Sequence, residues 1–167
     1  METKEITQYC LGFGYYNDCV VLIKKERPKW QKGFLNGVGG KLEKNETALE
    51  AMIREFFEET GQMTTADQWI HAGELIDPSL TDASVHIFIC KLTGYQFRSI
   101  YLNGSPEGSG EDLVILNVYL QAFLYHQSKK MLHNVLDLLI ETYRIYVQSI
   151  EATIMNNHEF VSRIKKP

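Results

Sequence analysis

The strongest candidates for a chemical site in this sequence are three glutamates within five residues, Glu55, Glu58 and Glu59. They fall three and four apart, so a helix turning about 100° per residue brings all three to one side. Like charges at these spacings destabilise a helix, so a cation that neutralises them is expected. Mg²⁺ prefers carboxylate oxygens and bridges them to substrate phosphates. The segment predicts a metal-dependent site for phosphate chemistry, although a solvated acidic helix face is the simpler alternative for three glutamates alone.

Capping signals bracket this segment. Thr47 and Glu50 have the spacing of a capping box and predict the start of a helix, and Gly61 is suited to end it. Arg54 precedes Glu58 by four residues, so we expect the two to pair and Arg54 to orient Glu58. The apolar residues fall on an adjacent stripe that predicts a buried face beside the acidic edge; they are Leu49, Met52, Ile53, Phe56 and Phe57.

A glycine-rich turn precedes the helix. In Gly37-Val38-Gly39-Gly40 the absence of side chains lets the backbone come close to a ligand. A glycine turn, a spaced glutamate, an Arg-Glu pair, a Glu-Glu pair and a closing glycine rarely occur together by chance. The combination favours a functional site over an ordinary charged helix face.

The segment from Gly40 to Gly61 resembles the Nudix box, G-x5-E-x7-R-E-U-x-E-E-x-G-U, in which U is a bulky apolar residue. The residues in register are Gly40, Glu46, Arg54, Glu55, Phe56, Glu58, Glu59 and Gly61. The last apolar position of the box is Gln62 here. We expect the neighbouring Met63 to supply the apolar contact instead.

The resemblance implies a fold, a cofactor and residue roles. The fold is an α/β/α sandwich with a mixed sheet, the box helix and a long C-terminal helix, in a single domain over residues 1–167. The activity is hydrolysis of a nucleoside diphosphate linked to another moiety, with Mg²⁺ or Mn²⁺. The implied metal ligands are Glu55, Glu58, Glu59 and the backbone carbonyl of Gly39. Arg54 would orient Glu58, while Gly40 and Lys41 would face the substrate phosphates.

Family members often take a further acid from a downstream loop as metal ligand or general base. Residues 103–112 here are rich in glycine and precede an apolar strand. Glu111 lies just before that strand and is the favoured candidate for both roles. Glu107 and Asp112 are the alternatives, and an ordinary polar loop is a further one.

A narrower resemblance concerns residues 36–41, Asn-Gly-Val-Gly-Gly-Lys, which are similar to a segment of MutT-like enzymes that remove oxidised purine nucleotides. It implies that Asn36 contacts the base, although asparagine also suits a turn. Some of those enzymes have Trp where this chain has Leu35. Trp30, Phe34 and Trp69 are candidates to stack on a base, and plain packing is their alternative.

The leading functional hypothesis is Mg²⁺-dependent hydrolysis of an (d)NTP or an oxidised (d)NTP to a nucleoside monophosphate and pyrophosphate. A second hypothesis keeps the chemistry and changes the substrate to ADP-ribose, NADH, a dinucleoside polyphosphate, a nucleotide sugar or capped RNA. A third is a non-catalytic module that binds a nucleotide or a protein. Such modules tend to lose box carboxylates, all of which are present in this chain.

Composition bounds the class of protein. The 167 residues are 44% hydrophobic and 23% charged, which is ordinary for one globular domain. A net charge of −4 argues against a bulk nucleic-acid-binding surface but not against a nucleotide substrate. Three cysteines without metal-ligand spacing predict buried free thiols and a cytoplasmic location. No signal peptide or membrane span is expected.

Alternation and turn residues predict strands over residues 6–14, 19–24, 69–76, 83–92 and 113–123, with a hairpin turn at Tyr16-Asn17-Asp18. Residues 26–35 are expected to form a loop. A long amphipathic helix is predicted from Ser128 to about Ile154. Because it exceeds what one packing helix needs, we expect a homodimer through it, with a kinked or two-part helix as the alternative. His126 and His133 read as core or surface residues.

Overall fold

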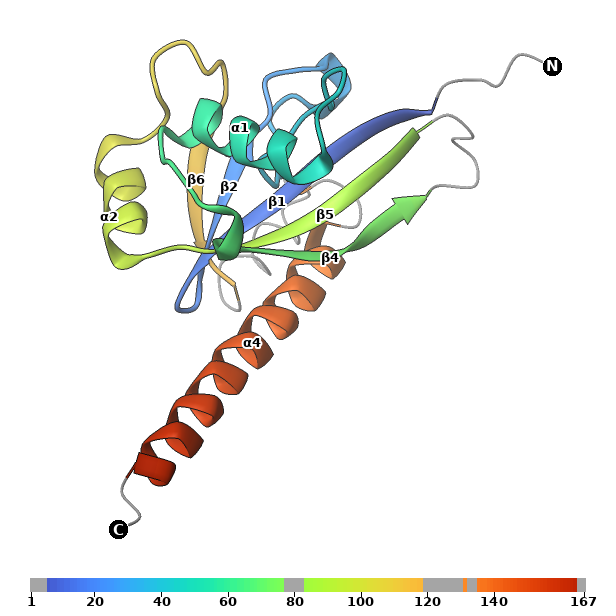
Figure 1. The fold of residues 1–167 in the computed structure, drawn as a ribbon. Helices are drawn as coiled ribbons and strands as arrows, with labels where there is room; N and C mark the ends of the chain where they lie inside the picture. The colour runs from blue at the N-terminus through green and yellow to red at the C-terminus, as the bar shows by residue number, and fades with distance from the viewer. Residues whose placement is uncertain (1–5, 77–82, 119–130, 132–134, 165–167) are drawn as a thin grey trace, which may run out of the picture.

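The computed structural model describes residues 6–76, 83–118, 131 and 135–164, with side chains described as far as residue 153. A mixed sheet forms its centre (Figure 1). Its strands are β1 (Thr7–Tyr16), β2 (Cys19–Lys24), β3 (Leu35–Asn36), β4 (Trp69–Ile76), β5 (Ala83–Lys91) and β6 (Asp112–Asn117). The strands are hydrogen-bonded in the order β3-β2-β1-β5-β4, and β6 also pairs with β2.

The sheet is mixed because β1 and β5 run parallel, whereas the other pairs are antiparallel. β1 and β2 form the expected hairpin, whose turn is tightened by Asn17 at φ 50°. Asparagine tolerates this left-handed conformation better than most residues. Beyond the hairpin, residues 38–41 run beside the first half of β1, with backbone hydrogen bonds from Gly12 to Val38 and from Cys10 to Gly40. The glycine-rich turn is therefore fixed to the central strand.

The helix α1 (Ala48–Thr60) begins and ends where the sequence predicts. Thr47 and Glu50 form a reciprocal capping box, and Gly61 at φ 69° closes the helix with a hydrogen bond to the Phe57 carbonyl. Met52 and Phe56 are fully buried, as expected. Phe57 differs from the expectation, because it lies at the edge of the apolar stripe and is 46% exposed.

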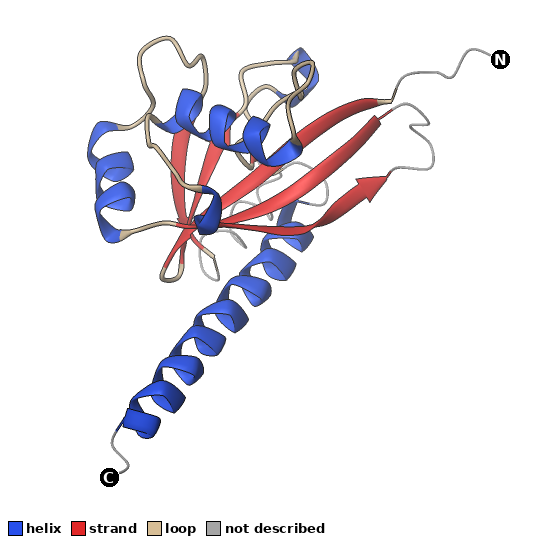
Figure 2. Cartoon of the chain, viewed as in Figure 1, coloured by secondary structure: helices blue, strands red, loops and turns tan. Residues whose placement is uncertain are grey.

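Helices cover both faces of the sheet, which gives an α/β/α sandwich (Figure 2). On one face α1 and the shorter α2 (Gly94–Asn103) pack over a cluster that includes Phe56, Trp69 and Ile100. On the other face α4 (Val135–Ile164) packs over a second cluster, where Leu139 is fully buried. Tyr15 on β1 links the sheet to α4, because its hydroxyl lies 2.7 Å from the Thr142 hydroxyl.

Several elements differ from the sequence prediction: β1 continues to Tyr16, and a short strand, β3, begins at Leu35, where a loop was expected. The helix α2 was not expected, although Thr93 and Gln96 form a capping box that marks its start. The strand after the glycine-rich loop ends at Asn117, and the expected residues 119–123 lie outside the described ones. The same holds for the expected start of the long helix at Ser128 and for His126 and His133. α4 continues to Ile164, ten residues beyond the expected end.

None of the helices in the described ranges is long and apolar enough to cross a membrane. All three cysteines are free thiols, as predicted; Cys10 and Cys90 are buried and Cys19 is half-buried.

Candidate active site

The glycine-rich turn packs closely against α1 on one side and β1 on the other. A Cβ atom on Gly40 would overlap the carboxylate of Glu55, and one on Gly39 would overlap the Cys10 carbonyl. The turn is thus pressed between β1 and the acidic edge of α1. This close packing explains why glycine occupies both positions.

Arg54 organises the acidic edge. Its guanidinium binds Glu46 with two hydrogen bonds, from Nε to Oε1 at 2.8 Å and from Nη2 to Oε2 at 3.0 Å. Nη1 also donates to Glu55 at 2.8 Å, whereas its contact with Glu58 is longer, at 3.4 Å. The Arg54–Glu58 contact that the sequence predicts is present but weak. The planar guanidinium instead binds both carboxylate oxygens of Glu46, and this contact ties the loop before α1 to the helix.

Glu46 completes this network on the loop side. Its Oε2 atom accepts a hydrogen bond from the Glu43 backbone at 2.9 Å, and Arg54 also donates to the Lys41 carbonyl at 3.3 Å. The guanidinium beside Glu46 holds the pKa of that carboxyl below its usual range. Glu46 is therefore an ionised anchor for Arg54 rather than a group that points into the pocket.

Glu59 is the least satisfied carboxylate of the helix. Its Oε2 atom is shielded from solvent and has no hydrogen-bond partner. Burial raises the pKa of Glu59 to about 8; the charges of Glu55 and Glu111 also raise it, while Lys25 and the Gly39 backbone lower it. A buried, unsatisfied carboxyl oxygen is costly unless a ligand compensates it.

A pocket of about 380 Å³ lies along the acidic edge. It is lined by Glu55, Glu58 and Glu59 on α1 and by Glu107, Gly108 and Ser109 on the loop before β6. Across the ranges with described side chains, no three Asp, Glu, His or Cys residues converge closely enough to hold a metal ion as they stand. Arg54 donates to Glu55 and, more loosely, to Glu58. The four carboxylates line the same pocket, but no three of them converge on one point.

Glu111 occupies a different position from Glu107. Its Oε1 atom pairs with the Lys25 ammonium at 2.9 Å, and its Oε2 atom accepts from the Glu26 backbone at 2.7 Å. The side chains of Lys25 and Glu111 are only 15% and 8% exposed. Both oxygens of Glu111 are thus engaged in joining the end of β2 to the start of β6, and Asp112 lies exposed within β6.

A family model for the NUDIX domain matches residues 13–108 of this chain. The chain belongs to the Nudix family. It is a Nudix pyrophosphohydrolase, an enzyme class that acts on nucleoside diphosphates linked to another moiety and that generally uses divalent metal ions. The matched range contains the glycine-rich turn, α1 and Glu107, so the family match covers the pocket described above except for Ser109.

Solved structures share the fold of this Nudix protein at low identity. A MutT/nudix protein from Listeria innocua is 14% identical, with a TM-score of 0.62, over 89% of this chain and 98% of that one. An ADP compounds hydrolase is 16% identical, with a TM-score of 0.62, over 86% and 74%. A MutT/nudix protein from Enterococcus faecalis is 14% identical, with a TM-score of 0.57, over 70% of this chain. This chain spans only 46% of that protein. Among curated protein sequences, none matches.

The remaining residues predicted from the Nudix resemblance lie around the same turn. The Asn36 side chain accepts a hydrogen bond from the Gly37 backbone at 2.9 Å, which is a turn-stabilising contact. The Lys41 side chain is exposed beside the Arg54 network. The expectation for Met63 was wrong, since Met63 is 69% exposed. Gln62 instead donates to the Ser99 hydroxyl of α2, so a polar contact replaces the apolar one.

Sequence reasoning missed the contribution of Lys25. This residue has no motif of its own, and only the pairing of β2 with β6 brings it to Glu111 and near Glu59.

The aromatic residues predicted as candidates for base stacking differ in their exposure. Trp69 is 7% exposed and packs edge-on against Phe56, whereas Trp30 is 69% exposed. Trp69 is a packing residue, and Trp30 is open to a ligand.

The donor set fits a divalent cation. The side chains that line the pocket offer hard oxygen donors, four carboxylates and the Ser109 hydroxyl, and the orphaned Oε2 atom of Glu59 is the kind of group that a cation compensates. The backbone of the glycine-rich turn lies against the same acidic edge, with Gly40 beside the Glu55 carboxylate and Gly39 beside Glu59. These features provide the negative charge and the space that a bound cation needs.

We expect Glu59→Gln to uncouple the stability of the protein from Mg²⁺. An excess of Mg²⁺ of about a hundred times the Kd should raise the wild-type Tm by about 5–10 °C. The variant should unfold without metal at the wild-type temperature or above it, because a neutral amide replaces a buried, unsatisfied carboxyl. Its Mg²⁺-induced shift should be lost. Differential scanning calorimetry with Glu50→Gln as the control checks this, and a full Mg²⁺ shift in Glu59→Gln would contradict it.

Proposed function

We propose that this enzyme uses Mg²⁺, or Mn²⁺ in its place, to hydrolyse an (d)NTP or an oxidised (d)NTP to a nucleoside monophosphate and pyrophosphate. The observation that carries the proposal is the pocket in which Glu107 joins the three glutamates of α1. Two cations that contact this acidic cluster are already paired with carboxylates, Arg54 with Glu46 and Lys25 with Glu111. Metal ions would offset the remaining carboxylate charge as a polyphosphate approaches.

Glu55, Glu58, Glu59 and the Gly39 carbonyl would hold the metal, which would lower the pKa of a bound water and offset the phosphate charge. Arg54 acts as a positioning residue that anchors Glu46 and steadies Glu55. Glu107 lines the pocket opposite α1 and is suited to orient the attacking water. Glu111 would act indirectly, by keeping Lys25 beside Glu59.

Water then attacks a phosphorus atom, and the bond from that phosphorus to the bridging oxygen breaks. The exposed Lys41, next to the glycine-rich turn, would bind the departing phosphates together with the backbone of Gly40. Asn36 would contact the base with the amide nitrogen, because its side-chain oxygen already accepts from Gly37. Three free thiols support a cytoplasmic location for this activity.

Trp30 supports a nucleotide substrate. It lies on a loop closed by backbone hydrogen bonds between Lys25 and Phe34 and between Gly33 and Lys25, and steadied by the Lys32–Glu26 ion pair. The same loop lies near the loop before β6, since a Cβ atom on Gly110 would stand 3.3 Å from Nη2 of Arg27, and Gly110 follows the pocket-lining Ser109. An exposed indole on a loop of this kind is suited to stack on a base.

Trp30→Ala is therefore expected to raise KM about tenfold with little change in kcat, because stacking binds the ground state and the transition state equally. Steady-state kinetics on the preferred nucleotide checks this. Tyr95→Ala is the matched control, since Tyr95 is 82% exposed on α2 and has no role in the proposal. An unchanged KM in Trp30→Ala would remove Trp30 from the substrate site.

The substrate class is tested by incubating the protein with Mg²⁺ and a panel of NTPs, dNTPs, 8-oxo-dGTP, ADP-ribose, NADH and a diadenosine polyphosphate, with identification of the products. Pyrophosphate and a nucleoside monophosphate from a triphosphate are the expected products. Two phosphorylated products from a bridged diphosphate would instead favour the second substrate class. Nucleotide binding without any turnover would favour a non-catalytic module.

A further inference from the structure

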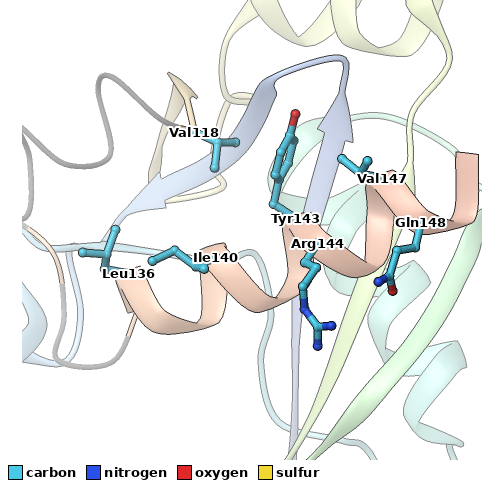
Figure 3. A pocket seen from close by; sticks show the side chains of 7 residues that line it. All are labelled: Val118, Leu136, Ile140, Tyr143, Arg144, Val147 and Gln148. Atoms are coloured by element: carbon cyan, nitrogen blue, oxygen red, sulfur yellow. The ribbon is translucent and has the colours of Figure 1, made fainter. Parts of the chain in front are cut away.

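A pocket of about 450 Å³ lies beside α4 (Figure 3). Its walls include Val118, Leu136 and Tyr143, which belong to or pack against the apolar cluster between α4 and the sheet. Among the described residues that line it, Arg144 alone carries a charge, and it pairs with Glu141 at 2.9 Å. This pocket is therefore part of the packing of α4 on the sheet, and the homodimer expected through α4 stays a prediction.

The Lys25–Glu111 ion pair adjoins the carboxylate pocket and is more buried than the contacts of Arg54. The side chains of Lys25 and Glu111 are 15% and 8% exposed, compared with 24% for Arg54 and 14% for Glu46. Desolvation largely offsets the attraction within a buried ion pair, so net stability is a weak explanation for its presence. The surroundings of this pair indicate that it fixes the position of a loop.

Glu111 is the last residue of the loop that joins α2 to β6 and brings Glu107 to the pocket. The tip of the loop is a turn, in which the Ser109 amide donates to the Pro106 carbonyl at 3.2 Å and Gly108 has a φ of 85°. The Ser109 hydroxyl donates to the Glu111 carbonyl at 3.2 Å, which ties this turn to the buried end of the loop. Glu107 lies exposed at the turn.

Contacts with two other elements hold the loop on either side of Glu107. Before it, Pro106 lies against the end of α1, where a Cβ atom on Gly61 would stand 3.3 Å from Pro106 Cγ. After it, the Glu111 carboxylate pairs with the ammonium of Lys25, the residue that follows β2, at 2.9 Å. Glu107 is thus suspended between a contact with α1 and the ion pair at β2.

The Lys25 backbone is itself fixed. Its amide donates to the Phe34 carbonyl at 2.8 Å, and its carbonyl accepts from the Gly33 amide at 2.7 Å. These bonds close the loop that carries Trp30, and they do not involve the Lys25 side chain. A substitution of that side chain therefore breaks the ion pair and leaves the closure of the Trp30 loop in place.

We propose that Lys25 is a positioning residue of the active site, which acts through its ion pair with Glu111 to hold Glu107 opposite the glutamates of α1. The inference rests on the proposed function, in which Glu107 orients the attacking water. It assigns to Lys25 an effect on the rate of the chemical step, while the Trp30 loop binds the base.

The position of the loop is tested without substrate or metal, by hydrogen exchange and mass spectrometry on the full chain. Lys25→Met and Glu111→Gln should each speed the exchange of amides in residues 105–111 about tenfold, because the loop opens more often. Glutamine keeps the side-chain volume and an oxygen that can accept from the Glu26 amide. Lys24→Met, a change in the exposed neighbour, is the control and should leave the exchange unchanged. Unchanged exchange in Lys25→Met and Glu111→Gln would overturn the proposal.

Steady-state kinetics on the preferred nucleotide separates positioning from plain stability. Below their Tm, Lys25→Met and Glu111→Gln should each lower kcat about ten- to a hundredfold, with KM within about threefold of wild type. The double variant should lose no more kcat than Lys25→Met, because the two side chains act as one unit. A lower Tm with wild-type kcat would overturn the proposal, and so would losses that multiply in the double variant.

Two further controls keep these outcomes distinct. Circular dichroism checks folding, and Glu111→Gln and the double variant carry the test if the unpaired carboxylate of Lys25→Met prevents folding. A wild type that turns over no nucleotide would contradict the proposed function, whereas the exchange measurement would still decide whether the ion pair holds the loop.

Discussion

Glu58→Gln is expected to lower kcat by about a thousandfold or more while the fold stays intact, because it removes a charged metal ligand without changing side-chain volume. The Glu58 side chain is 56% exposed, and among the described residues it contacts Arg54 at 3.4 Å. Its replacement should therefore change the free energy of unfolding by less than about 0.5 kcal/mol. Activity assays and urea unfolding on the same preparation measure the two effects.

Glu50→Gln is the matched control for this variant. It makes the same chemical change in the same helix, but Glu50 lies at the capping box, where glutamine serves equally well. This control should keep wild-type activity. A Glu58→Gln enzyme with wild-type kcat would show that Glu58 is not a ligand, and equal losses in both variants would point to the helix rather than the site.

Arg54→Ala is expected to lower both stability and activity. It leaves the carboxylates of Glu46 and Glu55, which are 14% and 15% exposed, without their shared cation. The free energy of unfolding should fall by about 3 kcal/mol in metal-free buffer. Activity should fall about a hundredfold, with a higher Mg²⁺ concentration needed for half-maximal rate, because Glu55 loses its orientation.

Arg54→Lys separates charge from geometry. Lysine keeps the positive charge but is unable to bind Glu46 with two parallel hydrogen bonds, so this variant should recover only part of the stability and little of the Mg²⁺ affinity. Arg98→Ala, an exposed arginine on α2, is the control and should behave as wild type. If Arg54→Ala kept the wild-type Mg²⁺ requirement, Arg54 would be a structural residue only.

Local signals in the sequence were sufficient for the acidic helix. The ends of α1 follow from Thr47, Glu50 and Gly61, since capping and the left-handed glycine depend on neighbouring residues alone. The strands β2 and β4 were predicted to the residue for the related reason that turn residues bound them. The capping box of Thr93 and Gln96 was an equally local signal, and it was overlooked in predicting α2.

Long-range pairing was beyond the reach of these signals. The engagement of Glu111 by Lys25 depends on the register of β2 with β6, which brings residues 86 positions apart into contact. The stronger bond of Arg54 to Glu46 depends on how the loop before α1 folds back, whereas helical spacing favours Glu58. The sequence alone does not distinguish Trp30 from Trp69, because both are tryptophans. Their exposed fractions in the structure, 69% and 7%, distinguish them.

We propose above that the carboxylates of α1 hold a metal ion that the reaction needs. The most direct test measures pyrophosphate release from the best nucleotide of the panel by metal-stripped wild type titrated with Mg²⁺, beside Glu58→Gln. We predict no release without metal, a saturable rise with Mg²⁺ in the wild type, and at most about a thousandth of that rate in the variant. Release without metal, or the same Mg²⁺ curve in both proteins, would contradict the account.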